Sequence, residues 1–296
     1  MVDKYKSKSL EIVTVEEVQS SSPGSSTDSG NETDDTMVDQ TKYLFKLRGK
    51  RILIIGGSSG IGYAVAEAAI EHGGDVVVSS SNPERVAEAV KSLKNAYPSA
   101  ALGISGFACD ISDETTLEAN IVRLLQQVGA LDHVVFTAGN RIPVVPLSEA
   151  TPQAVHAEMT IRYVAPVILA KHCSAYLRSS FESSITLTAG VVTEKPIPGW
   201  SVVAGARQAI LGLTRALAYD LRPVRTNAVV VGTLNTNTWS HFPKEAKDKA
   251  WQSYVSRTTT GRIAEASDVA EAYLYCMKDT NVTGSTVSSN GGVILT

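Results

Sequence analysis

A glycine-rich loop stands between an apolar run and a run of helical composition. Residues 52–55 are all Ile or Leu, residues 56–62 read Gly-Gly-Ser-Ser-Gly-Ile-Gly, and residues 63–72 favour a helix. Glycines in such a turn let a pyrophosphate approach the backbone, and a helix N-terminus stabilises its charge. The loop alone could be only a tight turn, but the flanking strand and helix favour phosphate binding. We predict that a dinucleotide contacts Gly56, Ser58, Ser59, Gly60, Ile61 and Gly62.

The end of the second predicted strand bears on which dinucleotide binds. It reads Ser79-Ser80-Ser81-Asn82, and Arg85 follows within one helical turn. An acid here would bind the ribose 2′-OH and repel a 2′-phosphate, whereas hydroxyl groups, an amide and a nearby cation tolerate the phosphate. The same residues could instead cap the helix that begins near residue 83. We predict NADP(H) rather than NAD(H), with Ser80, Ser81 and Asn82 in the cofactor site.

Alternating strands and helices must position these residues. The sequence predicts strands over 51–55, 75–79, 102–108, 133–136, 184–187, 225–231 and 286–288. It predicts helices near 60–72, 83–97, 113–128, 152–176, 203–221 and 268–277. Continuous apolar strands separated by helices indicate a parallel sheet covered on both faces. We therefore predict an α/β fold, a single doubly wound Rossmann domain with a parallel sheet of about seven strands and ligands at the carboxyl ends of its strands.

The composition changes at about residue 40. Residues 20–36 consist of Ser, Thr, Asp, Glu, Gly, Asn and Pro, which offer too little apolar surface to offset the entropy of ordering. We predict a disordered acidic Ser/Thr-rich tail over residues 1–40 and an NADP-binding Rossmann domain over residues 41–296. The tail could be a phosphorylatable regulatory segment, but we favour a solvated leader.

Charge and cysteine usage argue against several other classes of protein. The formal net charge is −3, and no polybasic stretch indicates a nucleic-acid or membrane partner. No apolar run approaches the ~18 residues of a membrane helix. The three cysteines stand far apart, and the histidines lack metal-ligand spacing, so no metal site is expected. The N-terminus resembles neither a secretory signal nor a mitochondrial presequence, so we expect a cytoplasmic protein.

From about residue 45 to the end, the chain resembles the short-chain dehydrogenase/reductase family. Its glycine loop matches the family's G-x-x-x-G-x-G pattern, and Cys109-Asp110-Ile111 matches the strand-end acid that contacts adenine in the family. Thr137-Ala138-Gly139 stands for the usual Asn-Ala-Gly, and Asn290-Gly291-Gly292 for Asp-Gly-Gly. Residues 231–236 replace the segment that holds the nicotinamide amide. The resemblance thus implies cofactor contacts from Asp110, Ile111, Ala138, Gly139, Gly232 and Thr236.

The family's usual catalytic residues are absent. Alignment on residues 212–218 places the tyrosine position on Val203, the lysine position on Arg207 and the asparagine position on Arg162. The serine position falls at residues 188–190, where Thr188 keeps a hydroxyl. General acid catalysis contributes ~10²–10⁴ in rate, so the loss of the tyrosine should impair ordinary ketone reduction. Arg207 stays protonated and can still bind the nicotinamide ribose.

Three of these positions are the candidate catalytic residues: Arg162, Thr188 and Arg207. An arginine that points inward needs an anionic or polarised partner. Arg162 could therefore contact both cofactor and substrate, or it could pair with Glu158 one turn earlier. Thr188 could orient a substrate oxygen or simply end a strand. A fairly large apolar substrate is indicated by aromatic residues in two segments, Trp200 in one and Trp239, His241 and Phe242 in the other.

Three functions are compatible with these residues. The first is an NADP(H)-dependent reductase of secondary metabolism that acts on an iminium or a strongly polarised acceptor, as the resemblance to tyrosine-lacking fungal pathway relatives implies. The second is a non-redox cyclase or isomerase in which Arg162 stabilises charge. The third is a non-catalytic NADP-binding subunit whose tail recruits a partner. We rank the reductase first, and we expect a homodimer or homotetramer because the family pairs its two long helices across a two-fold axis.

Overall fold

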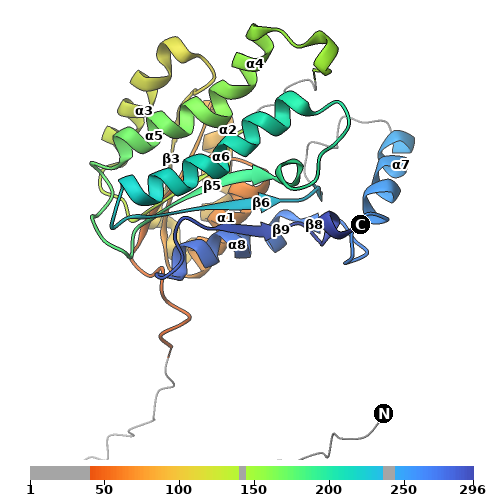
Figure 1. Cartoon of the computed structure of the whole chain (residues 1–296). Coiled ribbons are helices and arrows are strands. Elements are labelled where there is room, and N and C mark those ends of the chain that lie inside the picture. Colours follow the sequence, from red (N-terminus) through yellow and green to blue (C-terminus); the bar gives the residue numbers. More distant parts are fainter. Residues whose placement is uncertain (1–40, 140–144, 236–243) are drawn as a thin grey trace, which may run out of the picture. The chain divides into compact units, whose positions relative to one another are not determined.

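Seven parallel strands form one sheet with helices on both faces (Figure 1). The structure is a computed structural model that describes residues 41–139, 145–235 and 244–296. The sheet has the order β3-β2-β1-β4-β5-β6-β9. Its strands are β1 (Arg51–Ile55), β2 (Asp75–Ser80), β3 (Ile104–Ala108), β4 (His133–Phe136), β5 (Ser184–Gly190), β6 (Arg225–Val231) and β9 (Thr286–Ser289). The predicted doubly wound fold is confirmed, and its strand order reverses between β1 and β4, where such sheets bind ligands.

The helices divide into two layers. The first layer consists of α1 (Gly60–Glu71), α2 (Pro83–Ala96) and α8 (Ala266–Lys278). The opposite face carries α3 (Glu114–Val128), α5 (Ala165–Cys173) and α6 (Ser201–Asp220) (Figure 1). Among the unpredicted elements of the described residues are α7 (Lys244–Val255) and a two-stranded pair formed by β7 (Leu234–Asn235) and β8 (Ala264–Glu265). A 3₁₀ helix at Pro98–Gly103 replaces the expected start of β3 at residue 102.

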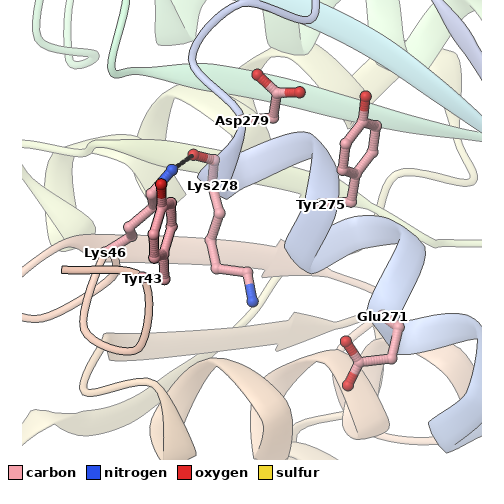
Figure 2. A pocket seen from close by; sticks show the side chains of 6 residues that line it. All are labelled: Tyr43, Lys46, Glu271, Tyr275, Lys278 and Asp279. Atoms are coloured by element: carbon pink, nitrogen blue, oxygen red, sulfur yellow. Dashed lines mark hydrogen bonds between the residues drawn. The ribbon is translucent and has the colours of Figure 1, made fainter. Parts of the chain in front are cut away.

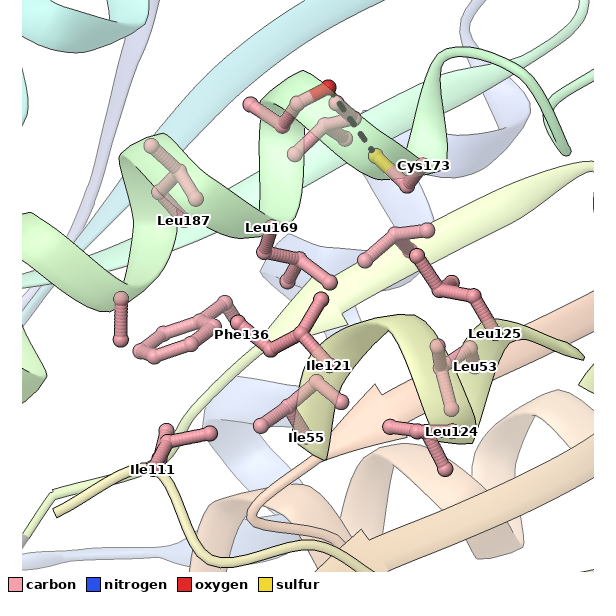
Figure 3. Close-up of a cluster of buried hydrophobic side chains, with 14 of the residues drawn as sticks. Leu53, Ile55, Ile111, Ile121, Leu124, Leu125, Phe136, Leu169, Cys173 and Leu187 are labelled. Atoms are coloured by element: carbon pink, nitrogen blue, oxygen red, sulfur yellow. Dashed lines mark hydrogen bonds between the residues drawn. The ribbon is translucent and has the colours of Figure 1, made fainter. Parts of the chain in front are cut away.

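Two buried clusters lie on the two sides of the sheet. Alternate residues of a strand point to opposite faces, so Leu53 and Ile55 join the cluster under α3, α5 and α6, while Ile52 and Ile54 join the cluster under α1, α2 and α8. Figure 3 shows the first cluster, in which Leu124 and Leu125 are fully buried. Burying one such side chain contributes roughly 1.5–3 kcal/mol. The sheet is therefore held rigidly between its helices.

The long helix predicted over residues 152–176 is interrupted by a π-helical turn. It consists of α4 (Pro152–Met159), the π-helical turn η3 (Thr160–Val164) and α5. Pro166 has no backbone N–H to donate to the carbonyl of Arg162, four residues earlier. The N–H of Ala165 donates to the carbonyl of Thr160, five residues earlier. Such π turns occur frequently at functional sites, and this one carries Arg162.

The predicted tail and the predicted absence of a membrane helix concern the chain beyond the sheet and its helices. The acidic tail over residues 1–40 lies outside the described residues. Within the residues that are described, no helix is long and apolar enough to cross a membrane.

His133 gives the stability of the fold a dependence on pH. It is buried at the start of β4, and its Nδ1 lies 2.9 Å from the Ser184 hydroxyl on β5. Burial, with the charges of Arg225 and Lys50, lowers the pKa of His133 to about 3. Below pH ~6.5 His133 binds a proton in the unfolded chain but not in the folded chain. The free energy of unfolding therefore falls as the pH drops toward 3, by at most about 1.4 kcal/mol per pH unit.

We expect His133→Gln to flatten this dependence. Urea unfolding of the parent between pH 7 and pH 5 should give a steeper loss of unfolding free energy than the variant shows. His156→Gln, at an exposed position, should keep the parental slope. Equal slopes for the parent and His133→Gln would contradict the expectation.

Candidate active site

The glycine loop after β1 leaves no room for side chains at two positions. Gly56 has a φ of +90°, and a Cβ there would lie 2.6 Å from the backbone nitrogen of Ala138. A Cβ on Gly62 would overlap the carbonyl oxygen of Gly56. The end of β4 is fixed against the loop because the Thr137 N–H donates to the Ile55 carbonyl at 2.8 Å. This cradle lies at the point where the strand order reverses, and it fits a dinucleotide pyrophosphate.

The N-terminus of α1 faces this cradle without a competing anion. Ser59 is the N-cap, and its side chain makes no capping hydrogen bond. The first turn of α1 contains no acidic residue. The first N–H groups of a helix have no partner within the helix, so those of Gly60, Ile61 and Gly62 can bind a phosphate.

The end of β2 provides hydroxyl groups and no acid. Ser80 Oγ is buried and has no hydrogen-bond partner among the described residues, and Ser81 is exposed. Asn82 caps α2, since its Oδ1 accepts from the Arg85 N–H at 2.7 Å. The capping interpretation therefore holds for Asn82, while the Ser80 hydroxyl is buried and Ser81 is exposed at the end of the strand.

The remaining predicted cofactor residues follow other strands of the sheet. Asp110 comes just after β3, and its carboxylate accepts from the Ser112 N–H at 3.0 Å and the Ser112 hydroxyl at 2.8 Å. Ile111 is buried in the core. The Gly232 N–H, after β6, donates to the Ser289 carbonyl. The predicted residues Thr236, Trp239, His241 and Phe242 lie outside the described residues.

Two arginines and one glutamate meet next to this cofactor cradle. Arg162 Nε lies 3.3 Å from Oε1 of Glu158, whose side chain is only 2% exposed. The two terminal nitrogens of Arg162 face Gly139, because a Cβ there would lie 2.9 and 3.0 Å from them. Arg207 faces Gly190 in the same way. The pairing alternative for Arg162 is therefore confirmed, and its terminal nitrogens also face the end of β4.

Burial perturbs all three ionisable groups. It raises the pKa of Glu158, and the charges of Arg162 and Arg207 oppose that rise. Burial and the charge of Arg162 together lower the pKa of Arg207 to about 10, and the charge of Glu158 opposes this shift. The pKa of Arg162 is lowered by burial and raised by Glu158. Both arginines remain cationic at neutral pH, so the cluster carries at least one net positive charge. Such perturbed groups at one place mark a candidate active site.

The expected role of Thr188 requires a correction. Its hydroxyl lies 2.7 Å from the Phe136 carbonyl and 2.7 Å from the hydroxyl of Tyr273, a fully buried residue of α8. Thr188 therefore faces the α8 side of the sheet, whereas Arg207 extends from α6 on the other side. Gly190 lies against Arg207 instead, so the position next to this arginine has no hydroxyl group.

Val203 provides no proton donor. Its side chain is apolar and 5% exposed, and it lies on α6 one turn before Arg207. The buried, cationic site next to it can stabilise negative charge on a reacting oxygen. Sequence reasoning considered Glu158 only as a pairing partner; its burial inside the site appears only in the structure.

A pocket lies away from this site. It lies between residues before β1 and the helix α8 with the residue after it, and is lined by Tyr43, Lys46, Glu271, Tyr275, Lys278 and Asp279 (Figure 2). Lys46 Nζ donates to the Lys278 carbonyl at 3.2 Å. The pocket contains none of the predicted site residues.

The strand order, the glycine cradle and the charged cluster define a nicotinamide-dependent oxidoreductase. A family model described as an SDR-like Rossmann domain matches residues 43–296, and the chain belongs to the short-chain dehydrogenase/reductase family.

Fungal proteins of this family are similar to the chain over nearly their whole length. The short-chain dehydrogenase/reductase fsr5 of Gibberella fujikuroi is 40% identical over 259 residues, which cover 86% of this chain and 98% of fsr5. Its counterpart malC of Malbranchea aurantiaca is 40% identical over 253 residues, which cover 84% of this chain and 96% of malC.

Two solved structures are also similar. The MalC reductase/Diels-Alderase superposes with a TM-score of 0.81 at 38% identity and covers 86% of this chain and 100% of that one. A small-chain dehydrogenase in complex with NADPH superposes with a TM-score of 0.68 at 26% identity, over 84% of this chain and 100% of that one.

Proposed function

We propose that this protein is an NADPH-dependent reductase acting on a fairly large apolar intermediate of secondary metabolism. The observation that carries the proposal is the cluster of the buried Glu158 with the partly buried Arg162 and Arg207, which lies beside the dinucleotide cradle. The fungal relatives named as short-chain dehydrogenase/reductases and the neighbour solved with NADPH support it. A cytoplasmic homodimer or homotetramer is part of the same proposal.

Some residues of the site would bind the cofactor, and others would stabilise charge on the substrate. When bound, NADPH supplies a hydride. The N-terminus of α1 would hold the pyrophosphate, and the exposed hydroxyl group of Ser81 would hold the 2′-phosphate, since the Ser80 hydroxyl is buried. Arg207 donates to the nicotinamide ribose, taking the place of the family's lysine. Arg162 donates from its terminal nitrogens to a substrate oxygen near Gly139 and stabilises the negative charge that develops there.

The absence of a proton donor at Val203 restricts the acceptor. A simple ketone leaves a basic alkoxide that needs a proton at once, and the valine side chain cannot give one. A strongly polarised acceptor, such as a conjugated carbonyl or quinone, leaves a stabilised anion that can take its proton from water. We therefore assign this kind of acceptor to the site.

A second candidate function is a cyclisation without net redox change. It is favoured by the similarity to the neighbour named as a reductase/Diels-Alderase. Arg162 would then polarise a carbonyl group of the substrate, and the cofactor would be retained without turning over. Oxidation of bound NADPH during turnover separates the two functions.

The proposal is tested by mixing the NADPH-loaded protein with phenanthrenequinone, a large polarised acceptor, and following the absorbance of the reduced nicotinamide. We expect oxidation with NADPH to be about tenfold or more faster than with NADH at subsaturating cofactor, because no acid repels the 2′-phosphate. Ser81→Asp should reverse this preference by charge repulsion.

The control places the same charge away from the cofactor. Ser179→Asp lies in the exposed segment before β5, at the amino end of the strand, and should keep the parental preference. Tighter binding of NADH than of NADPH to the parent, or no oxidation of either cofactor, would overturn the proposed reductase.

A further inference from the structure

We propose that Arg162 and Arg207 together select a substrate that carries an anionic oxygen, a carboxylate or an enolate, and reject a cation of the same size. The inference rests on the proposed function, because it names the substrate class of the same site. It decides between the two acceptors that the sequence leaves open, a cationic iminium and a polarised oxygen compound.

Positive charge exceeds negative charge in the cluster of Glu158, Arg162 and Arg207. Two guanidinium groups share one carboxylate, that of Glu158. Among the described residues, Arg207 has no ion-pair partner within 4.0 Å, and its buried Nε has no hydrogen-bond partner. Burying a charge without a partner is costly, so an arginine in this position calls for a ligand of opposite charge.

Among the described residues, the charged groups after β5 do not remove this excess. Glu194 follows β5 but accepts from the Ser288 hydroxyl at 3.0 Å and is exposed. Lys195 donates to the Val293 carbonyl at 3.0 Å and would only add positive charge. A cationic iminium would therefore enter a site that already repels it, whereas an anion would complete the cluster.

The two guanidinium groups face the ends of two neighbouring strands. Glu158 occupies the Nε side of Arg162, so the two terminal nitrogens are left facing Gly139. Arg207 faces Gly190. Phe136 of β4 pairs in register with Leu187 of β5. Gly139 follows Phe136, and Gly190 follows Leu187, by the same number of residues.

The two arginines thus face the carboxyl ends of two neighbouring strands, β4 and β5. A planar guanidinium is suited to carboxylate and enolate oxygens because its N–H donors match their geometry. Neither glycine has a side chain that could fill the space in front of the arginines.

The cofactor cannot supply the missing charge. In the proposed function its phosphates lie at the α1 N-terminus and at the end of β2. A ribose hydroxyl group can accept a hydrogen bond from Arg207, but it is neutral. The negative charge must come from the substrate.

The test uses three probes with the same ring system: 2-naphthoate, 2-naphthamide and 2-naphthyltrimethylammonium. Each is titrated by calorimetry into the full-length protein saturated with NADPH. We expect naphthoate to bind about tenfold or more tightly than the amide, and the ammonium to bind more weakly than the amide. Arg207→Gln should remove the preference for naphthoate over the amide, and Arg207→Lys should keep part of it.

Arg215→Gln is the matched control. It removes an exposed arginine from the same helix, two turns further along, and should leave all three affinities unchanged. An amide or ammonium that binds as tightly as naphthoate, no binding of naphthoate at millimolar concentration, or a preference that survives Arg207→Gln would overturn the inference. The affinity of the parent for NADPH is measured separately. A parent protein that does not bind NADPH would contradict the proposed function. Tight NADPH binding without a preference for the anion would contradict this inference alone.

Discussion

Replacing Arg162 by alanine is expected to lower kcat for quinone reduction by about 10²–10³-fold, the cost of removing one preorganised donor to a developing oxyanion. The substitution removes the two terminal nitrogens that face Gly139 and leaves the buried carboxylate of Glu158 without its 3.3 Å partner. Stopped-flow and steady-state rates at saturating NADPH measure the effect. Arg162→Lys should recover only part of the rate, because a lysine keeps the charge but not the two parallel donors.

A second variant separates a catalytic from a structural role. Arg162→Ala alone should also lower the melting temperature, since it leaves an unpaired buried acid. Adding Glu158→Gln removes that acid, so the double variant should regain much of the lost stability. If Arg162 stabilises charge on the substrate, the double variant stays slow. Recovery of both stability and rate would show that Arg162 serves only to neutralise Glu158.

The strands were predictable because most are runs of apolar residues with no competing pattern. The bounds predicted for β4, 133–136, agree with the structure even though the strand begins with a histidine. β5 is longer than predicted because it keeps its pairing with β6 as far as Gly190 and Val231. The polar helix α7 was missed because Lys244–Val255 has few apolar residues and no clear apolar stripe for a periodicity argument to detect.

The site residues whose positions follow from motif spacing could be predicted from the sequence. Those whose burial or direction depends on tertiary packing could not. Motif spacing placed Arg162 and Arg207 at positions that the structure brings together. The predicted role of Thr188 next to the substrate was wrong because Leu187 and Ala189 pack toward α5 and α6. The residue between them must therefore point to the opposite face of the sheet. This alternation is visible in the sequence once the inward face is known. The burial of Glu158 depends on the surroundings of α4, which no local pattern reports.

Gly62→Ala is expected to lower the affinity for NADPH by about 100-fold or more, through steric displacement of the loop. The added methyl group would overlap the Gly56 carbonyl oxygen and contact the Thr137 hydroxyl, so the loop and the end of β4 must move apart. Gly56 then no longer holds the turn that aims the N–H groups of α1 at the pyrophosphate. Overpacking of this kind also costs roughly 1–3 kcal/mol of stability. Fluorescence titration of NADPH and urea unfolding measure the two effects.

Gly205→Ala provides the matched control for this prediction. Gly205 is an exposed residue of α6, and a Cβ there would meet no atom within 4 Å. Its NADPH affinity should stay within about twofold of the parent, because the methyl group meets no other described atom of the same subunit within 4 Å. If Gly62→Ala instead unfolds the protein, its far-ultraviolet circular dichroism will show that directly. A folded Gly62→Ala variant that binds NADPH as tightly as the parent would mean that the cofactor is not held by this loop, since the overlap with Gly56 leaves no way to keep both the native turn and the methyl group.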